Sequence, residues 1–233
     1  MIQTESIIKV IGEKMILKNI TLNIVQGEAT AIIGPNGAGK STWLKIAAGL
    51  IKPTEGQVSL EGKQLKRDHY QRQQKIGYLG HQSFLYDHLT PAENLRFFAN
   101  LYRVKDADKK ISDLLEKVGL TFFKNEPVRS FSRGMIQRLA IARAILHEPE
   151  ILLLDEPHTG LDQEASQILN EVILRSKANG VTIIMVTHDF PQVVKTCERV
   201  ITFKNGRVCD DVRIKGNSTS WLRERYERQV MAQ

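Results

Sequence analysis

The chain has 233 residues, of which 42% are hydrophobic and 25% charged, and this ordinary globular composition excludes disorder along its whole length. No apolar run reaches the roughly 18 residues of a membrane span, and residues 1–14 lack the long apolar core of a signal peptide, so we expect a soluble protein. Its two cysteines indicate a reducing compartment, and its net charge of +7 is compatible with nucleic acid, anionic lipid or phosphorylated ligands.

The first fifty residues predict strands that lead into a helix. Loose apolar alternation around the breaks at Gly12 and Gly27 predicts two or three short antiparallel strands. Residues 28–33 predict a short apolar strand that runs into a glycine-rich turn. From Lys40 onward the apolar residues follow helical spacing, and Gly49 ends that helix.

The middle of the chain, from about residue 84 to residue 146, predicts a mostly helical region. Its clearest helix start has Thr90 as N-cap, proline at the first helical position and Glu93 at the third. A second helix is expected over residues 107–118, closed by Gly119.

Two short, continuous and mainly apolar runs, residues 151–154 and 181–186, flank a helical pattern over residues 163–178. Apolar strands that alternate with helices favour a buried parallel sheet. We therefore predict one α/β domain over residues 1–233, with a mainly parallel sheet core, an antiparallel β edge and residues 84–146 inserted as a helical subdomain.

Residues 34–41 fit the phosphate-binding pattern G-x-x-x-x-G-K-[ST] between a predicted strand and a predicted helix. Backbone amides of such a loop cradle the β- and γ-phosphates, and the following helix points its amino end at them. The Lys40 cation reaches the same oxygens, and the Ser41 hydroxyl ligates magnesium. A glycine turn without a ligand is the alternative, which the strand–loop–helix context disfavours. The predicted nucleotide-binding residues are Gly34, Pro35, Asn36, Gly37, Ala38, Gly39, Lys40, Ser41 and Thr42.

Polar residues follow both apolar runs. Asp155 and Glu156 end the first, so Asp155 is expected next to the magnesium ion, while Glu156 orients and polarises the attacking water. Without the phosphate loop this pair would be an ordinary solvated strand end. His188 follows the second run, where it can hydrogen-bond the γ-phosphate or the water, and a purely structural histidine is the alternative.

In this order and spacing the motifs resemble the nucleotide-binding subunit of ATP-binding cassette (ABC) transporters, from the strands before Gly34 to about Arg213. The resemblance implies a P-loop NTPase of the ABC type that hydrolyses ATP with Mg²⁺. It implies three catalytic residues, Lys40, Glu156 and His188.

Further roles come from the resemblance alone. Gln82 is similar to the glutamine that touches the metal and reports to the membrane subunit, which makes Ser41, Gln82 and Asp155 the implied metal ligands. Ser132 and Gly134 belong to a segment similar to the family signature, which contacts the γ-phosphate of ATP held by a partner subunit. A third segment, residues 160–162, is similar to the family's D-loop.

Two departures from the family pattern stand out. Arg133, Gly134 and Met135 follow the signature serine where two glycines and a glutamine are usual. Arg133 can add a charge-assisted contact to phosphate, or it can face solvent. Many relatives also carry an aromatic residue near the position of Ile11 that stacks on adenine, and residues 9–12 offer no ring. Base packing is then aliphatic or comes from elsewhere, which leaves the nucleotide preference open.

The resemblance also implies partners and a location. We expect integral membrane subunits, a second ATP-binding subunit that forms a homodimer with ATP, and a peripheral position on the cytoplasmic, inner face of the cell membrane. Residues 77–82, 89–97 and 132–135 resemble the ATPase of the haem exporter used in cytochrome c maturation. Such segments recur in other small export ATPases, so another export substrate stays open.

The alternative function is a soluble ABC-type ATPase that acts on nucleic acid or ribosomes, favoured only by the positive net charge. Proteins of that kind carry two cassettes or a long coiled-coil insertion. This chain has one phosphate loop, and only about fifty residues without sustained heptads lie between Gln82 and Ser132. A P-loop kinase would leave the signature segment unexplained. We therefore expect transport and no nucleic-acid partner.

Overall fold

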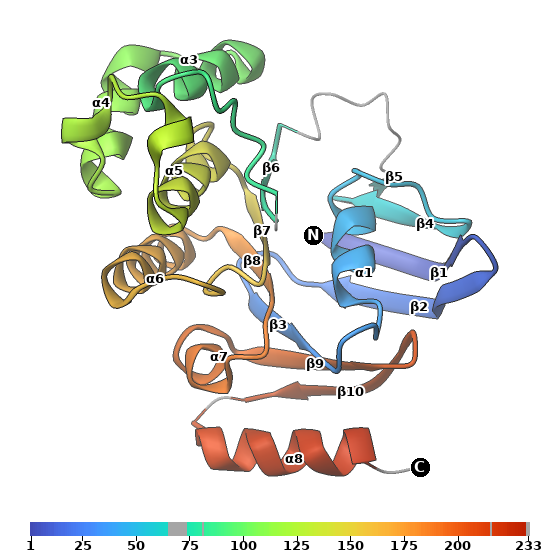
Figure 1. Ribbon diagram of the computed structural model, residues 1–233. Coiled ribbons are helices and arrows are strands. Elements are labelled where there is room, and N and C mark those ends of the chain that lie inside the picture. The colour runs from blue at the N-terminus through green and yellow to red at the C-terminus, as the bar shows by residue number, and fades with distance from the viewer. Residues whose placement is uncertain (65–73, 81, 215, 232–233) are drawn as a thin grey trace.

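Two β-sheets form the framework of the structure, a computed structural model that describes residues 1–64, 74–80, 82–214 and 216–231 (Figure 1). The first sheet is antiparallel, with strand order β2-β1-β4-β5. Its strands are β1 (Ile2–Ile11), β2 (Lys14–Ile24), β4 (Glu55–Leu60) and β5 (Lys63–Gln64). The first two are longer than the short strands predicted, because register shifts let the pairing continue past irregular residues such as Ser6.

The second sheet has the strand order β10-β9-β3-β8-β7-β6, and only β10 runs antiparallel to its neighbour. Its strands are β3 (Ala29–Ile33), β6 (Ile76–Leu79), β7 (Ile151–Asp155), β8 (Thr182–Val186), β9 (Arg199–Lys204) and β10 (Arg207–Arg213). Every residue of β3, β6, β7 and β8 is buried, which is why these strands are mainly apolar along their length rather than alternating. The predicted parallel core with an antiparallel β region is confirmed.

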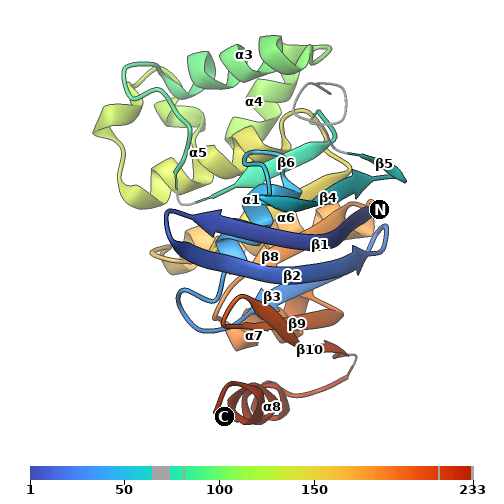
Figure 2. The same cartoon turned by 90° about the vertical axis from the view of Figure 1, so that its right-hand side faces the viewer.

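Some of the helices cover the second sheet, and others form a separate group at one end of it (Figures 1 and 2). They are α1 (Lys40–Ala47), α3 (Pro91–Tyr102), α4 (Ala107–Lys117), α5 (Arg133–Ile145), α6 (Gln163–Ala178), α7 (Phe190–Thr196) and α8 (Thr219–Met231), with short 3-10 turns η1 (Thr121–Phe123) and η2 (Val128–Ser130). Among the described residues, no helix is both long and apolar enough to cross a membrane.

Helix α1 packs between the two sheets. Trp43 is fully buried there, with its ring edge-on to Phe203 of β9 and its Nε1 3.4 Å from Thr4 Oγ1 of β1. One hydrophobic cluster therefore joins α1 to both sheets. A second cluster packs α5, α6, α7 and α8 on the opposite face of the parallel sheet.

Helices α3, α4 and α5 share a third hydrophobic cluster of their own. The predicted N-cap of α3 is present, because Thr90 Oγ1 accepts from the Glu93 amide at 3.2 Å and Glu93 Oε2 accepts from the Thr90 amide at 2.8 Å. The separate cluster agrees with an inserted helical unit over residues 84–146, and the division into domain and subdomain stays a prediction.

His147, just after α5, connects the helical group to strand β6. Its ring stacks on Tyr102 with centroids 4.0 Å apart, and its Nε2 lies 3.3 Å from the carbonyl oxygen of Ile76, so Nε2 carries the proton of the neutral ring. The other nitrogen, Nδ1, is buried and has no hydrogen-bond partner among the described residues. Burial lowers the pKa of His147 to about 4, because a second proton would place an unpaired charged group in the interior.

This burial predicts an acid-sensitive contribution to stability. The unfolded chain binds the proton near pH 6.5 and the folded chain only near pH 4, so the free energy of unfolding falls as the pH drops through that window. His147→Phe keeps the stacked ring and removes the titration, and the loss of stability over the window should shrink by on the order of 2 kcal/mol. Urea unfolding at pH 7, 5.5 and 4.5 measures this. His88→Gln, at an exposed histidine, is the control, and its free energy of unfolding should vary with pH as in the parent. If the free energy of unfolding of His147→Phe varied with pH in parallel with the parent, His147 would not be the source of the acid sensitivity.

Candidate functional site

The glycine-rich turn between β3 and α1 and the start of α1 together hold residues 34–42, the predicted phosphate-binding segment. The turn packs tightly against β2: a Cβ added to Gly39 would lie 2.6 Å from Leu17 Cδ2 and 3.0 Å from the carbonyl oxygen of Ile16. Gly39 also has a φ of +98°, so only glycine fits there. A Cβ on Gly37 would meet nothing within 4 Å, so the turn is open at that residue. The turn is therefore closed against β2 at Gly39 and has free space beside Gly37.

Lys40 is held over this turn. Its Nζ donates to the carbonyl oxygens of Gly34 at 2.8 Å and Pro35 at 3.1 Å, and the side chain is only 8% exposed. Burial lowers the pKa of Lys40, while the nearby charges of Glu156 and Asp155 oppose that shift. The turn thus contains a cation that is placed to meet negative charge.

Ser41 and Asp155 meet where α1 begins and β7 ends. Ser41 Oγ donates to Asp155 Oδ1 at 2.8 Å, and Asp155 is 2% exposed. A hydroxyl and a carboxylate are hard oxygen donors of the kind that Mg²⁺ prefers, so the donor set fits this ion. Gln82, the third implied ligand, lies exposed in the segment after β6, and the described contacts do not join it to the pair. The structure therefore brings together two of the three implied metal ligands.

Glu156 and His188 form a pair at the same edge of the sheet. Glu156 Oε2 lies 2.8 Å from His188 Nδ1, and the two side chains are 15% and 76% exposed. The Glu156 amide donates to the carbonyl oxygen of Val186 at 2.8 Å, which ties the residue to the end of β8. Its φ of +51° is uncommon for a residue other than glycine and stores backbone strain of about 1–3 kcal/mol. Sheet pairing and strain together fix the direction of this carboxylate.

Ser132 and Gly134 lie at the amino end of α5. Ser132 is the N-cap, and its Oγ accepts from the Met135 amide at 3.3 Å. A Cβ on Gly134 would lie 3.3 Å from Asp162 Oδ2, so α5 approaches the segment before α6 closely. The described contacts do not join Ser132 or Gly134 to the turn at residues 34–42. The structure therefore does not bring this end of α5 to its own phosphate-binding turn.

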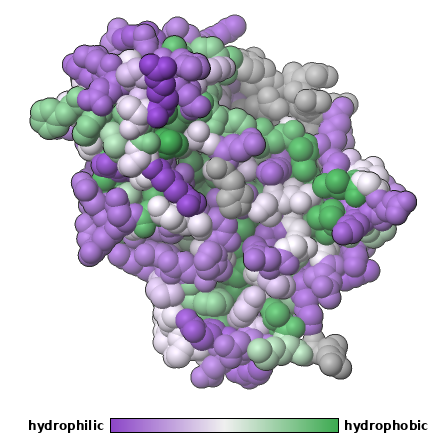
Figure 3. Space-filling view, in the orientation of Figure 1, coloured by the Kyte–Doolittle hydropathy of each residue, from purple (hydrophilic) through white to green (hydrophobic). Residues whose placement is uncertain are grey.

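An apolar surface without an aromatic ring adjoins the turn. Ile11 and Met15 lie at the tip of the β1–β2 hairpin and are 54% and 51% exposed. The next residues of β2, Ile16 and Leu17, are the ones that pack against Gly39. Figure 3 shows that hydrophobic residues on this view form small groups within a mainly hydrophilic surface. Aliphatic base packing at this tip stays a prediction.

Two contacts near Glu156 involve residues that the sequence analysis did not single out. His158 Nε2 lies 3.0 Å from Asn170 Oδ1 of α6, and burial lowers the pKa of His158. Gln137 Nε2 of α5 donates to the carbonyl oxygen of Pro157 at 3.3 Å. No local pattern marks these pairs, because each joins segments that are distant along the chain.

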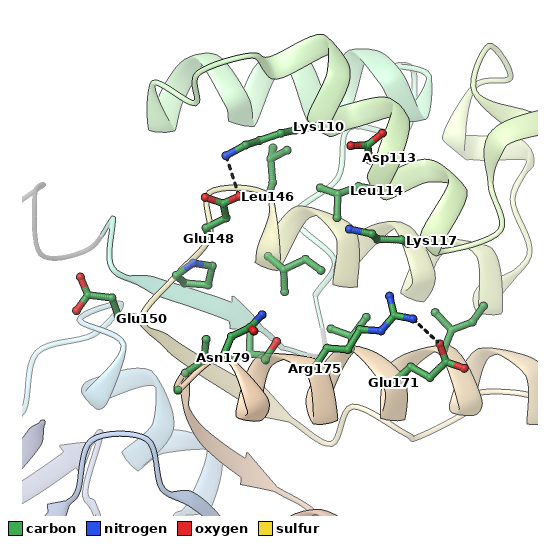
Figure 4. A pocket seen from close by; sticks show the side chains of 18 of the residues that line it. Lys110, Asp113, Leu114, Lys117, Leu146, Glu148, Glu150, Glu171, Arg175 and Asn179 are labelled. Carbon is green, nitrogen blue, oxygen red and sulfur yellow. Dashed lines mark ion pairs between the residues drawn. The ribbon is translucent and has the colours of Figure 1, made fainter.

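A separate cavity of about 940 Å³ lies between α4 and α6 and is lined by none of the predicted site residues (Figure 4). Its charged rim is partly paired within itself, with Lys110 Nζ 2.9 Å from Glu148 Oε1 and Arg175 Nη2 3.7 Å from Glu171 Oε2. Size alone therefore does not identify the site, and the chemistry lies at the carboxyl edge of the parallel sheet.

Comparison with known proteins gives consistent matches. The family model described as "ABC transporter" matches residues 17–159. The chain is 37% identical over 213 residues to the uncharacterized ABC transporter ATP-binding protein YdbJ of Bacillus subtilis (strain 168), covering 91% of this chain and 69% of that protein. It is 34% identical over 231 residues to the lantibiotic transport ATP-binding protein SrtF of Streptococcus pyogenes, covering 99% of this chain and 98% of that protein.

A solved structure is also similar. It is the dimeric structure of an ATP-binding cassette in a post-hydrolysis state, bound to ADP and Pi. The TM-score is 0.84 with 33% sequence identity, and the match covers 93% of this chain and 100% of that one.

Proposed function

This chain belongs to the ABC transporter family as an ATP-binding subunit with ATPase activity, and on that premise we propose that it powers an exporter from the inner face of the cell membrane. The observation that supports the site assignment most directly is the Glu156–His188 contact beside the Ser41–Asp155 pair. A base, its partner and two hard oxygen ligands then lie at the edge where the phosphate-binding turn opens. We therefore propose that ATP is hydrolysed at this edge of the sheet.

In the proposed reaction, the turn amides and Lys40 bind the β- and γ-phosphates and leave the γ-phosphorus open to attack. Glu156 orients a water molecule and takes its proton as the water oxygen bonds to phosphorus, and the bond to the β–γ bridging oxygen breaks. His188 lies against Glu156 and fixes its carboxylate. In this scheme the imidazole would also hydrogen-bond the γ-phosphate. Ser41 and Asp155, joined by Gln82, would hold Mg²⁺, which neutralises charge on the phosphate oxygens when bound.

A second copy completes the proposed site. The turn, the Ser41–Asp155 pair and Glu156 cover one side of the triphosphate, and charge that develops on the far oxygens needs further donors. The amino end of α5, with Ser132 and Gly134, is a set of donors that its own turn does not use. A two-fold dimer would place each α5 on the other copy's ATP. The likeness to a dimeric cassette supports this arrangement.

For the membrane partner, we propose a docking surface made of Phe84, Tyr86 and Phe97. All three rings are exposed, and the Tyr86 and Phe97 rings meet edge-on with centroids 5.0 Å apart. The Asn94 side chain, fully buried, accepts from the Tyr86 amide at 2.8 Å and donates to its carbonyl oxygen at 3.0 Å, which fixes this segment. A fixed group of exposed rings suits a protein partner better than solvent.

Two substrate classes have support. Residues 77–82, 89–97 and 132–135 resemble the haem exporter ATPase of cytochrome c maturation, and His81 within them lies outside the described residues. The relative SrtF, matched over nearly its full length, is named for lantibiotic transport. The named relative favours an antibiotic-type substrate, and haem stays a prediction. The resemblance to the haem exporter carries a direction, and export is the direction that we propose for either substrate class.

Glu156→Gln should abolish turnover and spare binding. The amide cannot take a proton, so the steady-state ATPase rate should fall at least about 10²-fold. Affinity for a fluorescent ATP analogue should stay within a few-fold of the parent, because the turn and Lys40 are unchanged. Glu150→Gln, an exposed glutamate at the other end of β7, is the matched control and should keep the parent rate. A parent-like rate for Glu156→Gln would overturn the assignment of the base.

Dimerisation should require ATP and the amino end of α5. In Glu156→Gln with ATP and Mg²⁺, light scattering should report the mass of two chains, and ADP should give one. Adding Ser132→Arg should restore the monomer, because the new side chain occupies the space that phosphate needs, while ATP binding persists. Ser112→Arg, on the exposed face of α4, is the control. A strict monomer with ATP would argue for a different second cassette or against the role of Ser132.

Membrane association should depend on the docking surface. Tyr86→Ala combined with Asp87→Lys should release the subunit from isolated membranes with little loss of ATP binding. Phe122→Ala removes a more exposed ring from η1, outside the surface, and should stay membrane-bound. Quantitative blotting gives the ratio of membrane-bound to released subunit. The membrane partner is identified as the protein that co-purifies with the parent subunit. If Tyr86→Ala/Asp87→Lys stays bound to membranes as fully as the parent does, the docking surface lies elsewhere.

A further inference from the structure

The segment that follows Glu156 contacts helix α5 at two points, through one hydrogen bond and one packing contact. Gln137 Nε2 donates to the carbonyl oxygen of Pro157 at 3.3 Å. The guanidinium of Arg133 lies against Gly160, where an added Cβ would be 2.5 Å from Arg133 Cζ and 2.7 Å from Nε. Residues 133 and 137 are four apart and so share one face of the helix. This face of α5 therefore packs directly on residues 157–160.

The same segment is short and held at its other points. The Thr159 amide donates to the carbonyl oxygen of Glu156 at 3.1 Å, and the Leu161 amide to that of His158 at 3.2 Å. Asp162 caps α6 by accepting from the Ala165 amide at 2.7 Å. Because these hydrogen bonds restrain the segment, a shift of α5 against it would displace the backbone of Glu156. That residue is already in a strained conformation.

Arg133 contacts Gly160 by van der Waals packing and not through an ion pair. Arg133 is exposed, and the described residues place no carboxylate within 4.0 Å of its guanidinium. Its neighbour is the backbone of a glycine with a φ of +76°. A glycine at position 133, as in the usual signature, could not make this contact. The departure from the signature therefore gives this chain an additional link between α5 and the residues after Glu156.

We propose that Arg133 and Gln137 are positioning residues for hydrolysis: they hold residues 157–160 against α5, so that movement of the amino end of α5 is transmitted to the Glu156 carboxylate. The proposal rests on the proposed role of Glu156 as the base. Small displacements matter at this site, because an error of about 1 Å in a catalytic group can cost as much as 10² in rate. The two residues act through Glu156 and touch neither ATP nor water in this scheme.

A double-mutant cycle tests the Arg133 contact. Gly160→Ala places a methyl group where the exposed Arg133 guanidinium lies and so displaces that flexible side chain from residue 160. Both Gly160→Ala and Arg133→Gly then lose the same contact, so each should lower kcat severalfold with KM for ATP within threefold of the parent. The double variant should lose no more than the more affected single variant, and not the product of the two losses, because there is only one contact to remove. Gly180→Ala is the matched control, because Gly180 has a φ of +77° and nothing within 4 Å of the added Cβ.

Gln137→Met tests the second contact without a glycine substitution. It keeps the length of the side chain and removes the donor to Pro157, so kcat should fall severalfold with KM and thermal stability near the parent values. A residue that only stabilises the fold would lower Tm and leave kcat per folded molecule unchanged. Arg133→Gly and Gln137→Met also keep the test valid if Gly160→Ala does not fold.

The outcomes separate this proposal from the function on which it rests. If Glu156→Gln hydrolyses ATP at the parent rate, the assignment of the base fails. If Glu156→Gln is inactive but Arg133→Gly and Gln137→Met both keep the parent kcat, the positioning role fails and the proposed function stands. Equal effects of Gly160→Ala and Gly180→Ala would likewise reject the contact with Arg133.

Discussion

The pairing of β8 with both of its neighbours is the constraint on which the site depends. Val186 lies opposite Ile32 of β3 and opposite Asp155 of β7. Its carbonyl oxygen also accepts from the Glu156 amide at 2.8 Å. A shift of β8 by one residue would turn every side chain of the strand to the other face and carry His188 away from Glu156. The phosphate-binding turn, the metal-ligand pair and the base are therefore aligned by one hydrogen-bond ladder.

Helix α5 joins this edge to the helical group. Its buried residues divide between two clusters, with Ala140, Ile141 and Ala144 packed toward the sheet and Leu139 and Ala142 toward α3 and α4. Arg143 is almost fully buried between them, where its Nη2 donates to the carbonyl oxygen of Tyr78 at 2.7 Å and its guanidinium lies over Phe98. A helix that is tightly packed on both sides moves as a unit. This makes α5 suited to carry a displacement from the proposed docking surface to the segment after Glu156.

Local chemistry let the sequence predict several features. The bounds of α6, residues 163–178, are those of its apolar pattern, and the Thr90–Glu93 cap of α3 has the bonds that its residue types predict. The apolar runs of β7 and β8 indicated a parallel sheet, because strands covered on both faces contain few polar residues. The glycine, lysine and serine spacing of residues 34–41 placed the turn between a strand and a helix. All of these signals come from residues close together in the chain.

The sequence by itself thus determined the α/β class, the phosphate-binding turn and the residues at the ends of β7 and β8. Only the tertiary structure decided which of those residues touch: Ser41 with Asp155, Glu156 with His188, and α5 with Pro157 and Gly160. It also decided the short or edge elements β6, β10 and α7, whose local patterns are weak. The physical reason is that these contacts join segments from 20 to more than 100 residues apart. Their geometry is set by sheet register and helix packing, which no local periodicity encodes.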